Sequence, residues 1–417
     1  MNRHARGFTL LEMLVVIVIL SMLVAITLPA IQSARNQARL AQDRNNLRQL
    51  GVGLIQFSDR DAQGRFCTGA YDFRRDGCPD TYGWVADLVN SQICKPGELL
   101  NPNGELRGIG ELNAMLTSPT SQTAQDGGSN RKLGDGQCGR NASYNSGAWS
   151  GLFAGTEAGS PARADYIARC FLEKGYNTNY VASWYLVRSA VKIAAGSSAN
   201  TWNSTSGSMR GLGATFGPLT RRKVENGRVS SSTIPLLGDG GSGNASDSIL
   251  SADLGKSPAT YWNGEESCID PKTAVFLAQG QWLTESANRG PSVYDPTGAK
   301  IQPLSEETDL TSQVQAEMTS GAVLPADTSE ANQGWLQDTR GWQAVHGGAL
   351  NILMADGSVK TFSDTNGDGF LNPGFPIRST HSDGEYQSLG YRPGPTELEP
   401  AEIFSGLFLE QVRRFMP

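Results

Sequence analysis

The pattern of hydrophobic and polar positions changes sharply within the first sixty residues. From Phe8 to Ile31 the chain is almost continuously apolar, and Glu12 is the only charged residue in that segment. A helix over this segment would be roughly 36 Å long, enough to cross a hydrocarbon core of about 30 Å. The pattern therefore predicts a transmembrane helix over residues 8–31.

The same helix is predicted to continue over residues 32–60 with an amphipathic pattern. Apolar side chains recur every three or four positions, at Ile31, Ala34, Ala38, Ala41, Leu47, Leu50, Leu54 and Phe57. This spacing places them on one face, which we expect to pack under a sheet. A kink or local melting is expected at Pro29, because proline removes a backbone donor. Turn-forming residues predict the end of the helix near Asp59 to Gly64.

The position of Gly7 distinguishes this N-terminus from an ordinary secretory signal, which is cut after its apolar stretch. Cleavage after Gly7 would leave the apolar helix on the mature chain. A lone carboxylate in a membrane span costs about 2.5 to 3.5 kcal/mol on insertion scales, so Glu12 should have a partner. The new α-amino group of a neighbouring copy is one candidate. The alternative is a plain signal anchor in which Glu12 is accidental.

The segment GFTLLE and the apolar run after it resemble the type III signal of type IV prepilins and type II secretion pseudopilins. The resemblance implies that a prepilin peptidase cuts between Gly7 and Phe8, that Phe8 is methylated, and that Glu12 meets the Phe8 amine of an adjacent subunit. Pro29 falls where pilin helices commonly carry a proline. The implied partners are the peptidase, other pilin or pseudopilin subunits and assembly-platform proteins.

Charge and length place a large acidic head outside the membrane. Arg3 and Arg6 precede the span, so the positive-inside rule predicts a bacterial inner-membrane protein with a single span and its head in the periplasm, or at the cell surface in a filament. The formal charge of −6 becomes 33 − 41 = −8 once both arginines of the leader are removed. An acidic head argues against nucleic-acid binding.

No enzyme is expected from the histidines and motifs. Only His346 and His381 remain after leader removal, and neither HExxH nor GxSxG occurs. A membrane-anchored binding module, such as a lectin or adhesin that engages glycans through exposed Trp, Tyr and Asn, remains the alternative function. Residues 177–188 combine aromatic and β-branched side chains and predict a strand.

Near the C-terminus, Asp356 and Gly357 separate two apolar runs and predict a β-hairpin with a type I′ turn, in which both central residues need positive φ. Nine residues separate His346 from Asp356. This spacing matches the H-x9-DG signature of a large pilin-like family whose members begin with the prepilin signal. We expect a structural role for His346 rather than a catalytic one.

The segment after the hairpin has calcium-loop spacing. Oxygen donors alternate at Asp364, Asn366 and Asp368, the Phe370 carbonyl and Asn372 follow, and Gly369 permits the sharp turn. Phe375 stands where an EF-hand has its bidentate Glu. The sequence predicts a structural calcium ion whose shell is closed by Asp383, Glu385 or water, and the alternative is a metal-free turn.

Six cysteines follow the span, and an even number in an oxidising compartment favours disulfides. They are Cys67, Cys78, Cys94, Cys138, Cys170 and Cys268. Fifteen pairings are possible for six cysteines, and Cys67 with Cys78 is the easiest to close.

The sequence thus predicts an α+β, pilin-like fold in which one long N-terminal helix packs on an antiparallel sheet with large loop insertions. Its parts are a leader (1–7), a membrane or filament-core helix (8–31), an amphipathic continuation (32–60) and a head (61–417). The head contains the hairpin and calcium-like loop at 346–375. We expect a structural pilin, either a minor pilin or a pseudopilin.

Overall fold

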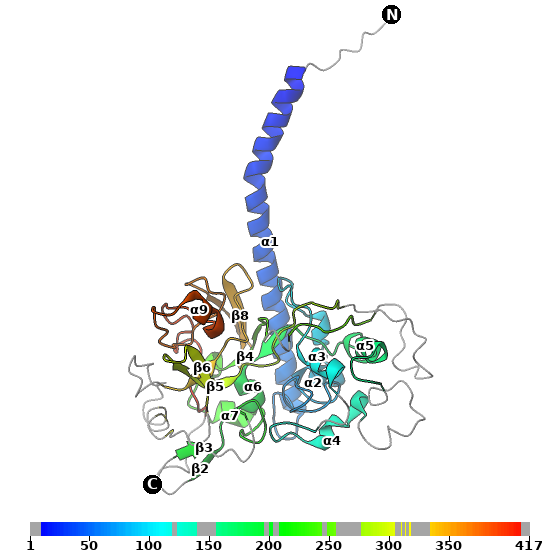
Figure 1. Cartoon of the computed structure of the whole chain (residues 1–417), viewed down its shortest axis with the longest axis vertical. Helices are drawn as coiled ribbons and strands as arrows, with labels where there is room; N and C mark the ends of the chain where they lie inside the picture. The colour runs from blue at the N-terminus through cyan, green and yellow to red at the C-terminus, as the bar shows by residue number, and fades with distance from the viewer. Residues whose placement is uncertain are drawn as a thin grey trace, which may run out of the picture.

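A computed structural model describes residues 10–118, 123–139, 156–195, 200–202, 208–243, 248–255, 277–304, 310, 313, 317 and 334–409. Figure 1 shows one long helix, α1 (Leu10–Arg60), projecting from a head that surrounds its C-terminal end. We call residues 10–39 of this helix the stem. The helix ends at Arg60, as the turn-forming residues predicted. It runs through Pro29 without a break, so the expected local melting is absent, although the helix curves gently in Figure 1.

The part of α1 inside the head packs through its large apolar side chains. Leu47, Leu50 and Leu54 are fully buried. Gly51 allows a close approach to the sheet, because a Cβ atom there would lie 2.6 Å from Cδ1 of Leu353. The predicted stripe therefore forms the contact with the sheet over its Leu-rich half, whereas its alanines at 34 and 38 lie on the exposed stem.

The sheet beside α1 has four antiparallel strands in the order β1-β4-β8-β9. They are β1 (Tyr180–Ala182), β4 (Pro235–Asp239), β8 (Ala349–Met354) and β9 (Val359–Ser363). The β8–β9 hairpin is the one predicted from the sequence, with Leu353 opposite Val359. β4 joins this hairpin to β1, so strands more than 100 residues apart lie side by side.

Two smaller antiparallel sheets lie away from α1. One has the order β6-β5-β7 and the other pairs β2 with β3. Their strands are β2 (Ile193–Ala195), β3 (Asn200–Trp202), β5 (Gly290–Asp295), β6 (Lys300–Pro303) and β7 (Leu336–Asp338). The long N-terminal helix and antiparallel sheets confirm the predicted α+β class.

Short helices fill the connections between strands. They are α2 (Trp84–Asn90), α3 (Glu111–Thr117), α4 (Asn130–Leu133), α5 (Pro161–Ile167) with the π-helical turn η4 (Ala168–Leu172), α6 (Trp184–Arg188), α7 (Arg221–Glu225) and α9 (Asp383–Leu389), with 3₁₀ turns η1 (Pro96–Glu98), η2 (Gly136–Cys138) and η5 (Ser231–Thr233). Most are too short to be stable alone and are held by packing.

The strand predicted over residues 177–188 is wrong beyond its first residues. Only β1 is extended, and the segment then turns into α6. The hydroxyl of Ser183 accepts the backbone N–H of Leu186 at 3.0 Å and so caps the new helix. All five residues of α6 are buried, so tertiary packing outweighs their β propensity.

Candidate functional site

The stem is almost purely apolar as far as Ile31, and the described head does not bury it. Residues 10–39 are all exposed. Among the described residues, α1 is the one helix long and apolar enough to cross a membrane, with a mean hydropathy of 2.9 in its most apolar window. Glu12 lies in the first turn of α1. Gly7 and Phe8, the predicted cleavage point, lie outside the described residues.

Where α1 enters the head, two carboxylates and a histidine form a buried group that we call the anchor cluster: Asp43, Asp239 and His346. Nε2 of His346 lies 3.3 Å from Oδ2 of Asp43 and 3.3 Å from Oδ2 of Asp239. All three side chains are at most 1% exposed. Asp43 belongs to α1, Asp239 ends β4, and His346 precedes β8. The cluster therefore ties the helix to two distant parts of the head.

Neutral polar groups complete the hydrogen bonds of both carboxylates. The Tyr180 hydroxyl donates to Oδ1 of Asp43 at 2.6 Å, and Nδ2 of Asn351 donates to Oδ2 of Asp43 at 2.6 Å. Oδ2 of Asp239 accepts the backbone N–H of Asn351 at 2.7 Å, and its Oδ1 accepts from Nδ2 of Asn101 at 2.8 Å. Each carboxylate oxygen thus has a donor, as a buried charge requires.

A second contact beside the cluster fixes the same turn of α1. Nε of Arg44 donates to the Thr361 hydroxyl at 2.9 Å and to Oδ1 of Asn351 at 3.3 Å. Thr361 lies on β9 and Asn351 lies opposite it on β8. Adjacent residues of α1 therefore hold both strands of the hairpin, which fixes the helix in rotation as well as in position.

The electrostatics of the cluster favour a bound proton. Burial lowers the pKa of His346, but its hydrogen bonds to Asp239 and Asp43 outweigh burial and raise the pKa from 6.5 to about 9. Burial, together with the negative charge of Asp43, raises the pKa of Asp239. At neutral pH His346 is therefore an imidazolium between two buried carboxyl groups, and Asp239, whose pKa is raised to about 7, keeps part of its proton.

The same three side chains could hold a metal ion, because their ligand atoms lie within 4.8 Å of one another. One imidazole nitrogen and two carboxylates are ligands that suit divalent cations. A cation would have to replace the proton of His346 and separate atoms that now hydrogen bond to one another. Since each carboxylate already has donors from the protein, the arrangement supports an internal ion network better than a metal centre.

The sequence pointed to His346 but not to its partners. Asp43 lies four residues before Leu47 and seven before Leu50, so an acidic residue falls on the buried face of the helix. An acidic residue on the buried face of an amphipathic helix was the signal by which the sequence could have identified Asp43 as a partner. Asp239, Asn101 and Asn351 reach the cluster only through the fold, and no local pattern marks them.

Asp356 and Gly357 form the hairpin turn, but not the type I′ turn that was predicted. Gly357 has a φ of 84°, whereas Asp356 is not among the described residues with positive φ. The Gly357 N–H donates to the Met354 carbonyl at 3.0 Å, and the Met354 N–H donates to the Ser358 carbonyl at 2.8 Å. This is a three-residue loop in which glycine alone takes the left-handed position. The turn sets the register between β8 and β9, and β8 begins three residues after His346.

The calcium-like loop is ordered by its own acidic side chains. Asp364 accepts the backbone N–H of Gly367 at 2.6 Å and that of Gly369 at 2.8 Å. Asp368 accepts the N–H of Phe370 at 2.8 Å. The backbone of the loop therefore folds around its own carboxylates. Calcium-binding loops have the same arrangement, in which the oxygen ligands converge on the cation.

Neither residue proposed to close this loop does so. Glu385 completes a capping box with Ser382 at the start of α9, and the Asp383 side chain is 90% exposed. Instead, buried Glu397 accepts the N–H of Thr365 at 2.6 Å and that of Asn372 at 3.0 Å. Asn372 also accepts from Phe375, and Oδ1 of Asn366 accepts from Asp368. Glu397 is thus the acidic residue that the sequence reasoning missed.

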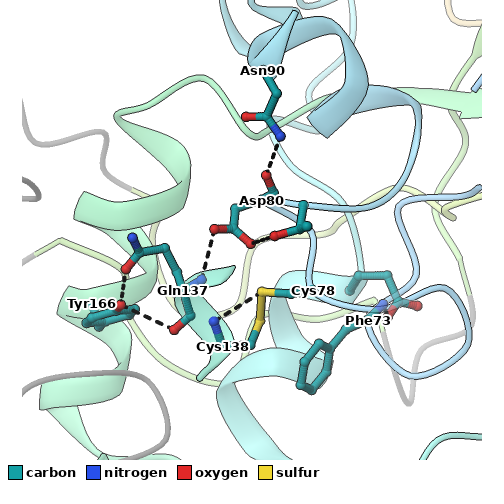
Figure 2. Close-up of a disulfide and its surroundings, with 9 residues drawn as sticks. Phe73, Cys78, Asp80, Asn90, Gln137, Cys138 and Tyr166 are labelled. Atoms are coloured by element: carbon teal, nitrogen blue, oxygen red, sulfur yellow. Dashed lines mark hydrogen bonds between the residues drawn. A yellow bond between two sulfur atoms is a disulfide. The ribbon is translucent and has the colours of Figure 1, made fainter. Parts of the chain in front are cut away.

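The cysteines pair differently from the prediction. Cys78 is bonded to Cys138 across 60 residues, so the pairing of Cys67 with Cys78 is wrong. Figure 2 shows the bond beside Gln137, whose backbone N–H donates to Asp80 at 2.9 Å. Cys67 and Cys94 carry unbonded thiols, Cys170 is buried, and Cys268 lies outside the described residues. The short sequence distance between Cys67 and Cys78 did not decide the pairing. A disulfide needs a particular distance and direction between two side chains, and the fold sets these.

Two family models match this chain. Residues 2–28 match the prokaryotic N-terminal methylation motif, and residues 111–369 match a family described as "Protein of unknown function (DUF1559)". No curated protein and no solved structure matches the chain. The second match covers more than half of the 417 residues and includes two members of the anchor cluster and the hairpin. The chain is therefore a pilin-like protein with a prepilin-type N-terminus, and it belongs to the DUF1559 family.

Proposed function

We propose that this protein is a structural subunit, a minor pilin or pseudopilin, of a type IV pilus or a type II secretion system, and that it is not an enzyme. The uncovered apolar stem is the observation that carries the proposal. An exposed apolar surface of this extent must be removed from water by lipid, by other helices, or first by one and then by the other. A retained prepilin helix meets lipid before assembly and neighbouring stems after it.

The proposed assembly step gives the charged groups at the N-terminal end of the helix and its apolar side chains different roles. Cleavage after Gly7 by prepilin peptidase frees the Phe8 amine, and Glu12 of one subunit neutralises this amine of the next subunit. In surroundings of low dielectric constant this attraction is far stronger than in water. Burial of the apolar side chains supplies the cohesion, while the charge pair sets the register between subunits.

The anchor cluster would transmit force between the stem and the head. A filament or secretion subunit is pushed and pulled through its helix, so the helix must not slide or turn within the head. Hydrophobic packing alone is non-directional. The hydrogen bonds of Asp43 and Arg44 are directional, and we propose that they lock the helix in place.

We also propose that the span lies in the bacterial inner membrane and that the head faces the periplasm before assembly. The arginines at 3 and 6 and the disulfide between Cys78 and Cys138 support this orientation. Disulfides persist in oxidising compartments such as the periplasm. Cysteine-labelling reagents that do not cross the membrane would test the side on which the head lies.

Mass spectrometry of the mature N-terminus tests the processing step. We expect a chain that begins with methylated Phe8. Recovery of the native chain with Met1 attached, or cut downstream of Ile31, would refute the proposal.

A Glu12→Leu variant tests the assembly step. We expect it to enter the membrane but to be absent from filaments or pseudopili, because the pairing carboxylate is gone. Ser21→Leu is the matched control, since it adds an apolar side chain elsewhere on the stem without removing a charge. Normal incorporation of Glu12→Leu would contradict the pairing.

We further propose that calcium binds the loop at 364–372, with Glu397 as the closing carboxylate. Calcium should raise the melting temperature of the full-length protein, and Asp364→Asn should abolish that increase. Asp383→Asn is the control, because the Asp383 side chain points to solvent outside the loop. An equal response of both variants to calcium would exclude this site.

A further inference from the structure

A polar cavity of about 860 Å³ opens on the head, remote in sequence from the stem. Its walls come from the loop at 72–75, from α3, and from the segments 248–251 and 279–286. The volume lies within the range of about 300 to 1,000 Å³ typical of small-molecule sites. Such sites usually have mainly apolar walls, so the polar lining of this cavity restricts its ligand.

Two of the three arginines in the wall, Arg75 and Arg210, are paired with carboxylates. Arg75 donates to Asp72 at 3.0 Å and to Asp126 at 2.8 Å. Arg210 donates to Glu285 at 3.0 Å. Because these charges are already neutralised within the protein, a ligand with a net charge gains little from them and would lose its hydration.

The remaining wall offers neutral hydrogen-bonding groups. Thr117, Ser248, Ser251, Gln279 and Ser286 line the cavity with hydroxyl and amide side chains. Hydroxyl groups both donate and accept, as do amides through their two ends. A ligand that presents many hydroxyl groups at fixed spacing matches this set.

Glu111 adds a carboxyl group to the same wall. Its Oε2 accepts the backbone N–H of Phe73 at 3.1 Å. Burial and the nearby carboxylate of Asp72 raise its pKa well above the usual range. A neutral carboxyl group can donate one hydrogen bond and accept others, so it too suits an uncharged ligand.

An exposed tryptophan lies on the cavity side of one of these segments. Trp282 pairs with Ile249 in an antiparallel bridge, and Ile249 lines the cavity. Residues opposite one another in an antiparallel bridge have their side chains on the same face, so Trp282 lies on the face of Ile249, beside the cavity. The residue is 43% exposed, which is unusual for one of this size.

We propose that this cavity binds the end of a neutral oligosaccharide, with Trp282 stacking on one sugar ring while the polar wall hydrogen bonds to its hydroxyl groups. Sugars combine an apolar ring face with polar edges, and the cavity supplies both kinds of surface. This binding function is separate from assembly and does not rest on it. A subunit with such a site would carry glycan recognition on its head.

The test uses the full-length chain in lauryldimethylamine oxide, a detergent without a sugar headgroup. Maltotriose, cellotriose, N,N′,N″-triacetylchitotriose and mannotriose serve as neutral probes, with anionic trigalacturonate for comparison. We expect at least one neutral trisaccharide to bind saturably in titration calorimetry and to bind more tightly than trigalacturonate. Trp282→Ala should weaken that binding about tenfold or more because the stacking surface is lost. A tenfold loss of affinity corresponds to about 1.4 kcal/mol.

Phe216→Ala is the matched control, because Phe216 is an exposed aromatic residue that neither lines the cavity nor, like Trp282, forms a bridge with a residue that does. It should leave the affinity unchanged. Gln279→Ala, on the exposed part of the wall, should weaken binding without unfolding the head. Three results would overturn the proposal: no saturable binding of any neutral trisaccharide at millimolar concentration, equal effects of Trp282→Ala and Phe216→Ala, or tighter binding of trigalacturonate.

Discussion

The two halves of α1 are one continuous helix in two different surroundings. The stem, residues 10–39, is exposed along its whole length and is almost purely apolar as far as Ile31. Residues 40–60 lie in the head, where Leu47, Leu50 and Leu54 are fully buried. The apolar half therefore has no cover within the described chain, and the more polar half forms part of the core.

This difference shows that hydrophobicity does not decide which half belongs to the head. The inner half contributes a mixed face, with leucines on the sheet and Asp43 in a network of donors. Those contacts fix one position of the helix. The stem offers many equivalent apolar contacts, which suits lipid and repeated neighbours. Variants that act on one half and not on the other can test this division.

The largest effect is expected for His346→Ala. Removing the imidazolium leaves the carboxylates of Asp43 and Asp239 buried beside each other, and breaking a buried ion network in this way costs about 3 to 5 kcal/mol. All eight tryptophans lie after residue 60, so denaturant unfolding followed by tryptophan fluorescence reports on the head. His381→Ala, at a histidine away from α1, is the control. If His346→Ala lowered the free energy of unfolding by less than about 1 kcal/mol, the cluster would not be what anchors α1 in the head.

Leu50→Ala and Leu20→Ala compare the two halves directly. Leu50 is fully buried, so its truncation should destabilise the head by about 3 kcal/mol through lost burial and a cavity. Leu20 is 54% exposed on the stem, and its truncation should leave unfolding of the head unchanged. If both variants destabilised the head equally, the stem could not be an independent part of the helix.

The stability of the head should fall as pH rises from about 6.5 towards 9. The folded protein holds the His346 proton more tightly than the unfolded chain does, so this contribution is complete below pH 6.5 and is lost through pH 9. It amounts to at most about 3.5 kcal/mol, from a rise of about 2.5 pH units at about 1.4 kcal/mol per unit. Urea unfolding across this range measures it. A His346→Gln variant should lose most of the slope above about pH 8, because the buried acids Asp87 and Glu317, with pKa values raised to about 7, contribute at lower pH. An unchanged slope above about pH 8 would assign it to other groups.

The smallest effect is expected for Gly51→Ala. The added methyl would contact Cδ1 of Leu353, and the strain should cost about 1 to 2 kcal/mol. The gain in helix propensity from alanine offsets about 1 kcal/mol of that strain. Val52→Ala is the control, since Val52 is 52% exposed on the next position of the helix. A more stable Gly51→Ala head would show that α1 and β8 can separate without cost.

Local patterns were sufficient for the elements that depend on neighbours in the chain. The spacing of apolar residues located α1, turn-forming residues located its end, and two apolar runs around Asp356 and Gly357 located the β8–β9 hairpin. Local reasoning failed at Trp184–Arg188, where a serine cap and complete burial produced a helix from strand-like residues. It also misjudged the turn, because two- and three-residue loops share the same Asp-Gly signal.

The sequence by itself determined the helix, its apolar stem, the family signature and the presence of an unusual histidine. Only the tertiary structure decided that His346 meets Asp43 and Asp239, that Cys78 bonds to Cys138, and that Glu397 reaches the calcium-like loop. The reason is physical. Periodicity and turn chemistry act between residues a few positions apart, whereas a buried charge finds its partners among whichever distant segments the packed core brings beside it.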